Sequence, residues 1–570
     1  TVNAPFDAPR TRAEQALADI WAELLGVSHI SRQDSFFDLG GHSLLIMQMI
    51  DRLSERGMTL GVSAVFRSAV LADLAQAIEQ QANQHTDRAQ GDHERGATGA
   101  IPAGTTQITP DMLPLLTLTQ AQIDRLAGEV AGGAANIQDI YPLTPLQEGI
   151  LFHHELSAHG GDAYVLPVAL RMKDDVTLDR FLRALQAVVD RHDALRTAMA
   201  WHDLPQPVQI VWRQAPLTVD TLALSDPAEC GHSEEAQLRA LMAPEHLNMS
   251  LQTAPLLRVQ LVRRAGAGAA GGTPYVLLQL HHIVCDHISL ELVLAEVAAL
   301  MQGVVGTLAP PVPYRDFVAY TLANSREKEA EAFFKARFSD VDDCTAPFGL
   351  TDVHGDGGQF DEAQCALDAS LSRQIRVQAQ QQGVSPAALF HLAWALVLAR
   401  CSGRSDVVFG TVMSGRLHAT QGVKGMQQIM GMFVNTLPVR VRMDAEDADS
   451  GSLPQALVRM HQELLDLVEF EQTPLTRAQR CSGVPAGAPL FTAMLNYRHS
   501  ALPNGGEAGG MSWHGIELVA SQERSNFPVS LSVDDTGQGF MLSAEVAHPH
   551  SARRLNAYML AAVASLVQAL

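Results

Sequence analysis

The chain lacks a long apolar run, an excess of basic charge and paired cysteines. No apolar stretch reaches the roughly 18–20 residues that a membrane-spanning helix needs, and no signal peptide opens the sequence. Its 40 basic residues face 62 acidic ones, and the net charge of −22 argues against nucleic acid, whose phosphates bind basic surfaces. The six cysteines are scattered without paired spacing, which fits a reducing cytosol. We therefore expect a cytoplasmic protein that binds neither membrane nor nucleic acid.

The composition is that of an ordinary globular protein with several domains. A length of 570 residues suits about three or four domain-sized units, and 47% hydrophobic residues suit ordered cores. No initiator methionine precedes Thr1, which suggests a segment of something longer. Residues 83–105 are polar, glycine-rich and aperiodic, as flexible tethers are. We predict a helical domain at 1–82, a linker at 83–105, and a body whose two lobes cover 106–310 and 311–570.

Hydrophobic periodicity separates a helical start from an alternating body. Apolar residues at helical spacing predict helices over residues 14–25, from 43 onward, and over 70–82. Strands are expected at 163–172, 207–211, 275–280, 406–412, 491–497 and 539–545, and further helices at 178–191, 236–243, 386–400 and 453–470 and from 289 onward. This alternation predicts α/β layers, and two halves of about 200 residues each predict a two-lobed body with a ligand cleft.

A histidine pair stands where one of the expected strands ends. His281 and His282 follow the apolar run 275–280 and open a loop that reaches Asp286. Catalytic imidazoles often occupy such an exit, because the strand fixes the backbone while the loop exposes the ring for proton transfer. Neighbouring strand residues point to opposite faces, so the two rings should not share one cavity. A purely structural pair is the alternative; no metal is expected, because metal-type spacings are missing around the pair.

A serine stands after two glycines at the start of the second expected helix, in residues 34–44, DSFFDLGGHSL. Serine at a helix start is often only a cap, but a helix N-terminus also stabilises a phosphodiester. The whole segment resembles the attachment motif of a peptidyl carrier protein. The resemblance implies a small four-helix carrier bundle with 4′-phosphopantetheine on Ser43, attached by a phosphopantetheinyl transferase.

The rest of the chain resembles a condensation domain of non-ribosomal peptide synthetases. The motifs that carry this resemblance follow in family order: 141–149 (YPLTPLQEG), 191–197 (RHDALRT), 281–286 (HHIVCD), 314–317 (YRDF), 410–416 (GTVMSGR) and 432–438 (MFVNTLP). The resemblance implies a multi-domain α+β protein in which a V-shaped pair of chloramphenicol-acetyltransferase-like α/β lobes encloses a tunnel. It also implies partners, namely an upstream adenylation domain and a downstream acceptor carrier of the same assembly line.

The resemblance also assigns roles around the histidine pair. His282 should face the tunnel as the main catalytic residue, with His281 beside it in the active-site motif. Asp286 should fix the loop through a buried ion pair, for which Arg416 and Arg196 are the candidates. A geometric role suits Asp286 better than a stabilising one, because buried ion pairs often contribute little net stability.

Three variants of the family have to be separated. Stand-alone epimerization domains carry a Glu-Gly-His-Gly-Arg motif that this sequence lacks. Dual epimerization/condensation domains carry a second histidine pair followed by Gly-Asp; His153, His154 and Asp162 resemble that pattern, although glutamate follows the pair where an aliphatic residue is usual. His287, in place of a common glycine, and the lead-in at 108–137 also resemble the dual branch. The alternatives are a satisfied surface or core pair at 153–154 and an ordinary condensation domain.

The implied chemistry is aminolysis of a thioester, preceded by inversion of the donor α-carbon. In the aminolysis His282 either removes an amine proton or steadies the adduct. Epimerization needs an α-proton removed and returned on the opposite face, with His282 as first base and His153 or His154 as a second group. Two other classes remain open: a docking platform without catalysis, which the intact motif disfavours, and an acyltransferase for small alcohols, which the fused carrier disfavours.

Overall fold

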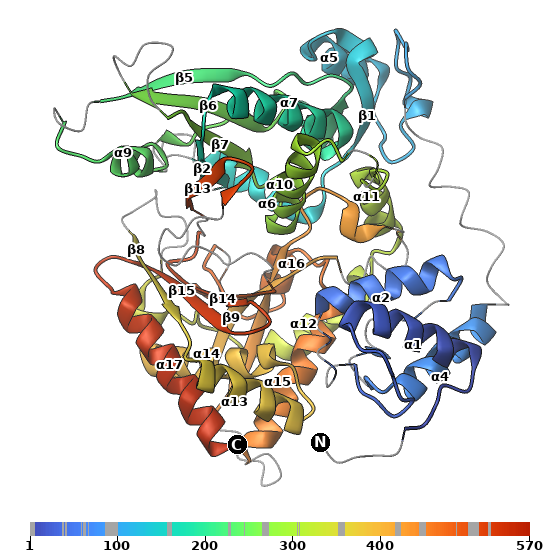
Figure 1. Cartoon of the computed structure of the whole chain (residues 1–570), viewed down its shortest axis with the longest axis vertical. Coiled ribbons are helices and arrows are strands. Elements are labelled where there is room, and N and C mark those ends of the chain that lie inside the picture. The colour runs from blue at the N-terminus through green and yellow to red at the C-terminus, as the bar shows by residue number, and fades with distance from the viewer. Residues whose placement is uncertain are drawn as a thin grey trace.

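The chain folds into a small helical domain and two lobes, each lobe built on a six-stranded sheet (Figure 1). The computed structural model describes residues 6–36, 39, 41, 43–58, 60, 64–65, 68–85, 101–156, 162, 164–225, 230–243, 246–264, 273–304, 306, 308–351, 360–416, 423, 425–443, 452–485, 487–499, 512–522 and 526–570. In Figure 1 the first lobe lies above the second, and the helical domain, in blue, lies beside the second lobe.

The helical domain contains α1 (Arg12–Leu25), α2 (Ser43–Glu55) and α4 (Leu71–His85) among its described residues. Thr11 begins α1, because its hydroxyl accepts the Glu14 N–H at 3.2 Å, and Gly26 ends it in the left-handed conformation. Trp21 and Phe36 are fully buried at the centre of the domain. The expected fourth helix is not among the elements of the described part, and residues 61–63, 66–67 and 86–100 lie outside that part.

The sheet of the first lobe holds the strand that ends at the histidine pair. Its order is β12 (Ser512–Trp513), β13 (Ile516–Ser521), β2 (Val165–Met172), β7 (Tyr275–His281), β6 (Leu257–Arg264) and β5 (Val219–Leu224). A three-stranded sheet, β1 (Ile137–Pro142), β4 (Val208–Trp212) and β3 (Thr197–Ala200), belongs to the same lobe. Its helices are α5 (Gln120–Glu129), α6 (Pro145–Leu156), α7 (Asp175–Arg191), α9 (Glu234–Leu241) and α10 (His287–Met301). Every residue of β7 is buried between β2 and β6, so the backbone at its end is held on both sides.

The second lobe repeats the plan around another mixed sheet. Its strand order is β10 (Asn435–Arg442), β9 (Asp406–Met413), β11 (Ala493–His499), β14 (Val529–Asp535), β15 (Phe540–Ala547) and β8 (Phe360–Ala366). Its helices are α12 (Glu327–Phe338), α13 (Ala369–Gln381), α14 (Pro386–Ser402), α15 (Leu453–Val468), α16 (Leu475–Arg480) and α17 (Ala552–Ala569), whereas α11 (Tyr314–Ala323) packs in the core of the first lobe. No single helix in the described part has the length and apolar character to cross a membrane; α13 and α14 meet that test only jointly, across a bend of 107°.

The expected fold class is confirmed, with pairings that the sequence did not reveal. The expected strands and helices are present with ends shifted by a few residues, as for β9 and α14. Among the described strands only β5–β6, β9–β11 and β11–β14 pair in parallel, so both sheets are mixed. The strand pair β12–β13 comes from the second half of the chain yet joins the sheet of the first lobe through β2 (Figure 1).

Candidate active site

His282 stands on a tight loop between β7 and α10 whose backbone is held at several points. Its N–H donates to the Tyr164 carbonyl at 2.8 Å, next to β2. The Cys285 N–H donates to the His282 carbonyl at 3.2 Å and so closes the turn. From α6, the Gln147 side chain donates to the Ile283 carbonyl at 2.8 Å. The position of the catalytic candidate is therefore fixed by its own loop and by two neighbouring elements.

The hydrogen bond of the His282 ring identifies its basic nitrogen. Nδ1 lies 3.1 Å from the Cys285 carbonyl oxygen, which can only accept, so Nδ1 carries the proton of the neutral ring. Nε2 then holds a lone pair. The ring is partly exposed and lines a cavity, whereas His281, one residue earlier, is fully buried. A neutral His282 can thus accept a proton at Nε2 from a group in the cavity.

The cavity, of about 1670 Å³, lies between the helical domain and both lobes. The helical domain contributes Gly41 and Leu45, which stand on either side of Ser43 in the sequence. Its α2 packs against a 3-10 turn, Met426–Gln428, of the second lobe, and Val468 of α15 packs against its hydrophobic core. The start of α2 therefore faces the same space as His282; the Ser43 side chain itself lies outside the described part.

A buried ion pair fixes the far end of the active-site loop. Asp286 caps α10 by accepting the Ser289 N–H at 2.8 Å. Both carboxylate oxygens accept from Arg416 Nη2, at 3.0 and 3.1 Å, and the two side chains are 1% and 0% exposed. Arg416 also donates to two backbone carbonyls at 3.1 and 2.9 Å, and its guanidinium carbon lies 3.8 Å from the centroid of the Phe433 ring. The charge of each partner is therefore compensated inside the protein.

This ion pair ties α10 of the first lobe to the connection between β9 and β10 of the second-lobe sheet, and the described part of that connection packs into the core of the first lobe. Ser289 reinforces the joint: its Oγ donates to the Gly431 carbonyl at 2.9 Å and accepts the Gly431 N–H at 3.0 Å. A Cβ at position 431 would lie 2.2 Å from the Tyr314 ring, so only glycine fits there. The joint keeps the active-site loop in register with the second lobe.

Arg196, the other candidate partner of Asp286, lies elsewhere in the first lobe. Its guanidinium donates to the Val189 carbonyl at 3.1 Å, to the Gln138 side chain at 3.0 Å and to the Trp212 carbonyl. These contacts tie α7, β1 and β4 together. The proposed choice between two arginines thus resolves to Arg416, and the structure does not bring Arg196 to the active-site loop.

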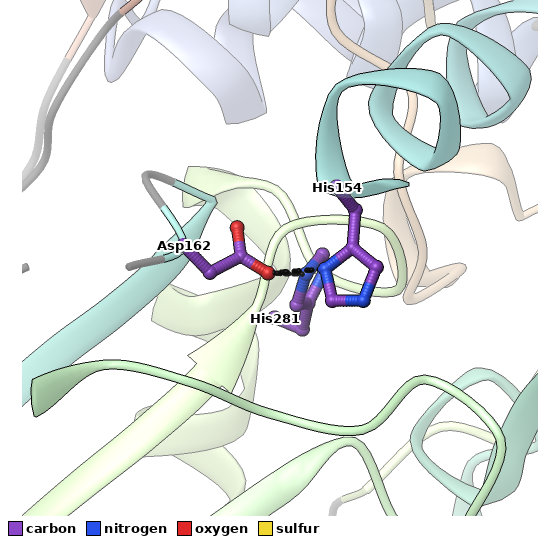
Figure 2. A group of neighbouring side chains, drawn as sticks. All are labelled: His154, Asp162 and His281. Carbon is purple, nitrogen blue, oxygen red and sulfur yellow. Dashed lines mark hydrogen bonds and ion pairs between the residues drawn. The ribbon is translucent and has the colours of Figure 1, made fainter. Parts of the chain in front are cut away.

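Three side chains meet behind the loop: His154 from α6, Asp162 and His281 (Figure 2). One oxygen of Asp162 lies 2.6 Å from His154 Nδ1 and 2.9 Å from His281 Nε2, and the other accepts the Tyr164 N–H at 2.9 Å. Burial by itself raises the pKa of Asp162, but the hydrogen bonds from the two rings outweigh it and hold the pKa well below its usual range. Asp162 is therefore a charged carboxylate bridging two imidazoles.

The hydrogen bonds decide which nitrogens of these rings carry protons. His281 Nδ1 accepts the Ile283 N–H at 3.1 Å, so the proton of the neutral ring is on Nε2 and is donated to Asp162. Burial lowers the pKa of His281, in spite of the opposing effect of Asp162, and keeps this ring neutral. The three ligand atoms lie within 4.8 Å of one another, a spacing that could also hold a metal ion. A protonated Nε2 is not available as a ligand, so we interpret the group as hydrogen-bonded.

The second histidine pair is divided between two environments. His153 lines the cavity, with its ring centroid 6.1 Å from that of Tyr164. His154 does not line the cavity, because its ring is turned to Asp162. His287, at the start of α10, also lines the cavity, with Nε2 3.2 Å from a Glu291 oxygen.

Tyr164 is the site residue that sequence reasoning missed. It lines the cavity, holds the His282 N–H through its carbonyl, and receives a hydrogen bond from Asn526 on its hydroxyl at 2.8 Å. Its one sequence signal is its place two residues after Asp162, at the end of the second histidine motif. Asn526 gave no signal, because it is 362 residues away along the chain.

Comparison with known proteins identifies the family. Residues 137–553 match the family described as condensation domain, and residues 15–78 match the one described as phosphopantetheine attachment site. Malpibaldin synthetase of Mortierella alpina is 42% identical over 575 aligned positions, which cover 99% of this chain and 10% of the synthetase. A linear gramicidin synthase protein of Brevibacillus parabrevis is 31% identical, over 70% of this chain and 8% of that protein. The chain belongs to the condensation domain family and spans about a tenth or less of these relatives.

Solved structures show the same fold. A four-domain non-ribosomal peptide synthetase bound to AMP and glycine has a TM-score of 0.60 at 16% identity, over 76% of this chain and 33% of that one. The condensation domain of the monacolin K polyketide synthase has a TM-score of 0.57 at 18% identity, over 76% of this chain and 98% of that one.

The carrier domain implies covalently attached 4′-phosphopantetheine. The residues before α2 fit such a group. A Cβ at Gly41 would lie 2.3 Å from the Phe36 ring and 2.6 Å from the Phe36 carbonyl oxygen, so the residue two positions before Ser43 packs against Phe36 and has room only for glycine. The N-terminus of α2, at Ser43, favours a phosphodiester, and Gly41 and Leu45 open onto the cavity.

Proposed function

We propose that this chain inverts the α-carbon of a donor carried on Ser43 and then joins that donor to the amine of an acceptor on a downstream carrier. The observation that carries the proposal is the shared cavity: Gly41 and Leu45, on either side of Ser43, and His282 line one space. Bound 4′-phosphopantetheine supplies a flexible arm whose thiol presents the donor as a thioester. A donor held by the docked carrier therefore has access to the catalytic ring.

For bond formation His282 is the group that handles the proton. The acceptor nitrogen attacks the donor carbonyl carbon, and Nε2 of His282, basic because Nδ1 donates to Cys285, takes one of the amine protons. The carbon–sulfur bond of the thioester then breaks, and His282 returns the proton to the leaving thiolate. The ion pair of Asp286 and Arg416 holds the loop between the lobes and acts through position alone. Orientation of the two reactants in the cavity supplies a further part of the rate.

For epimerization a proton must leave the α-carbon and return on the opposite face. His282 is the first base in this proposal. His153 is the candidate for the second proton-transferring group, because it lines the same cavity near Tyr164. Two groups in one cavity can serve opposite faces of a planar intermediate, which a single fixed base cannot do unless the substrate moves.

The test uses the holo-chain loaded at Ser43 with a peptidyl donor ending in an L-residue, in deuterated buffer. Without acceptor, the α-hydrogen of the donor should exchange with solvent; with an acceptor carrier, the product should contain the D-residue. His153→Phe should slow exchange more than it slows coupling of a pre-formed D-ended donor. Coupling of the L-ended donor without exchange would instead establish condensation alone, and a chain inactive in both assays would be a docking platform.

The wider setting is part of the proposal. Relatives named for the synthesis of malpibaldin and linear gramicidin support an assembly line with an upstream adenylation domain and a downstream acceptor carrier. A phosphopantetheinyl transferase would modify Ser43. The domain limits 1–82, 106–310 and 311–570, with a linker at 83–105, belong to the same proposal as divisions of the sequence, whereas β12 and β13 pair with the sheet of the first lobe.

A further inference from the structure

Asp162 is held firmly at the point where α6 meets the end of β7. Its backbone N–H donates to the Leu247 carbonyl at 2.7 Å, and its side chain is only 4% exposed. Three groups donate to its carboxylate: the rings of His154 and His281 and the Tyr164 N–H. All three donors are groups of the protein itself, so the carboxylate is hydrogen-bonded without any contact to a substrate.

Two routes lead from Asp162 to the catalytic ring. The first runs through His281, which is hydrogen-bonded to Asp162 and is covalently joined to His282. The second runs through Tyr164: Asp162 accepts its N–H at 2.9 Å, and its carbonyl accepts the His282 N–H at 2.8 Å. The backbone of His282 is thus positioned from both sides by one carboxylate.

We propose that Asp162 and His154 are positioning residues for His282, so that position 154 of the second histidine pair acts through hydrogen bonds while only position 153 meets the substrate. His154 holds the carboxylate from α6, and the carboxylate holds the two residues that fix the His282 backbone. The inference rests on the proposed function for its kinetic readouts, but the hydrogen-bonded state of the three side chains can be measured without any substrate.

Substitutions at position 154 distinguish positioning from proton transfer. Asparagine places an amide N–H where histidine has Nδ1–H and can still donate to Asp162, but it cannot exchange protons; leucine can do neither. We expect His154→Asn to keep coupling and α-hydrogen exchange close to wild type, and His154→Leu to lower kcat by up to about 100-fold, the effect of a displacement near 1 Å. If both variants lose exchange equally, His154 transfers protons itself and the inference fails.

Asp162→Asn tests the carboxylate against a matched control in the same lobe. Asp193 is also buried, and its carboxylate accepts backbone N–H groups, those of Ala194 at 2.8 Å and Tyr314 at 3.0 Å. Measured below both melting transitions, Asp162→Asn should lower kcat with little change in KM for the acceptor, whereas Asp193→Asn should lower only the melting temperature. Equal kcat in the two variants would mean that Asp162 contributes stability alone.

A direct readout needs neither carrier loading nor substrate. In histidine-selective ¹⁵N NMR, with the signal assigned by a His281→Gln variant, His281 should be protonated at Nε2 in the wild type. This protonation state should persist in Asp162→Asn, because the Ile283 N–H keeps Nδ1 an acceptor, but the ¹⁵Nε2 chemical shift should move as the charge-assisted hydrogen bond to the carboxylate is lost. Neither should change in His153→Phe. An unprotonated Nε2, or one equivalent of zinc that binds the wild type and not Asp162→Asn, would replace the hydrogen-bonded unit by a metal site and overturn the inference.

Discussion

Replacing Asp286 by alanine should strongly destabilise the joint between the two lobes. The substitution leaves Arg416, whose side chain is 0% exposed, as a buried charge without its carboxylate, at a cost of about 3–5 kcal/mol. It also removes the cap of α10, worth about 1 kcal/mol. Arg416 keeps its two backbone acceptors, so we expect a total near 4 kcal/mol, or roughly 8–16 °C in melting temperature for a lobe of this size.

Differential scanning calorimetry of the wild type and the variant measures this loss. The matched control is the exposed pair of Asp179 and Arg183, whose side chains are 66% and 71% exposed. Asp179→Ala should leave the melting temperature nearly unchanged, because an exposed ion pair contributes little. The double variant Asp286→Leu with Arg416→Met removes both charges and should be more stable than Asp286→Ala alone. A melting temperature of Asp286→Ala equal to that of the control would refute the reasoning.

The remaining predictions concern the carrier, the histidine pair and pH. Ser43→Ala should abolish the mass increase of about 340 Da upon treatment with a phosphopantetheinyl transferase, while circular dichroism stays unchanged; modification of the variant would place the attachment elsewhere. His282→Ala should remove coupling and α-hydrogen exchange together, and full coupling in this variant would exclude His282 as the catalytic residue. His281→Ala leaves a cavity at a fully buried position and should act mainly by lowering the melting temperature. Because the pKa of Asp162 is lowered on folding, its charged form stabilises the protein at neutral pH, and this contribution is lost as pH falls below its ordinary value near 4. The difference in melting temperature between the wild type and Asp162→Asn should therefore narrow on acidification; a constant difference would contradict the assignment.

The features that could be predicted from the sequence are those encoded within a few neighbouring residues. Helix α7 is an example: Asp174 accepts the Thr177 N–H at 2.8 Å as its cap, and apolar residues at helical spacing form its buried face. The burial of His281 and the partial exposure of His282 follow from the end of β7: His281 is the last residue of a wholly buried strand, and His282 is the first residue of the loop. The start of α2 at Ser43 was likewise predicted from neighbouring residues, because Ser43 follows two glycines and precedes an apolar run at helical spacing.

The tertiary structure decided which distant residues meet. The sequence offered two arginines for Asp286, and only packing of the lobes places Arg416 beside it, 130 residues away. The strands β12 and β13 joined the sheet of the other lobe, because edge pairing with β2 depends on the arrangement of both lobes and not on local pattern. Nothing in the sequence distinguished His153 from His154, yet in the structure His153 lines the cavity and His154 is hydrogen-bonded to Asp162.

The physical reason for this division is the range of the interactions involved. Caps, helical periodicity and strand alternation depend on hydrogen bonds and burial within a few residues, so the sequence of this chain determined its elements and its two reactive motifs. The bridge from Asp162 to His281 spans 119 residues and forms only after β2, β7 and α6 have packed. Such contacts depend on the relative position of whole elements, so the tertiary structure decided the distant neighbours of His282, whereas its contacts with Cys285 lie within its own loop.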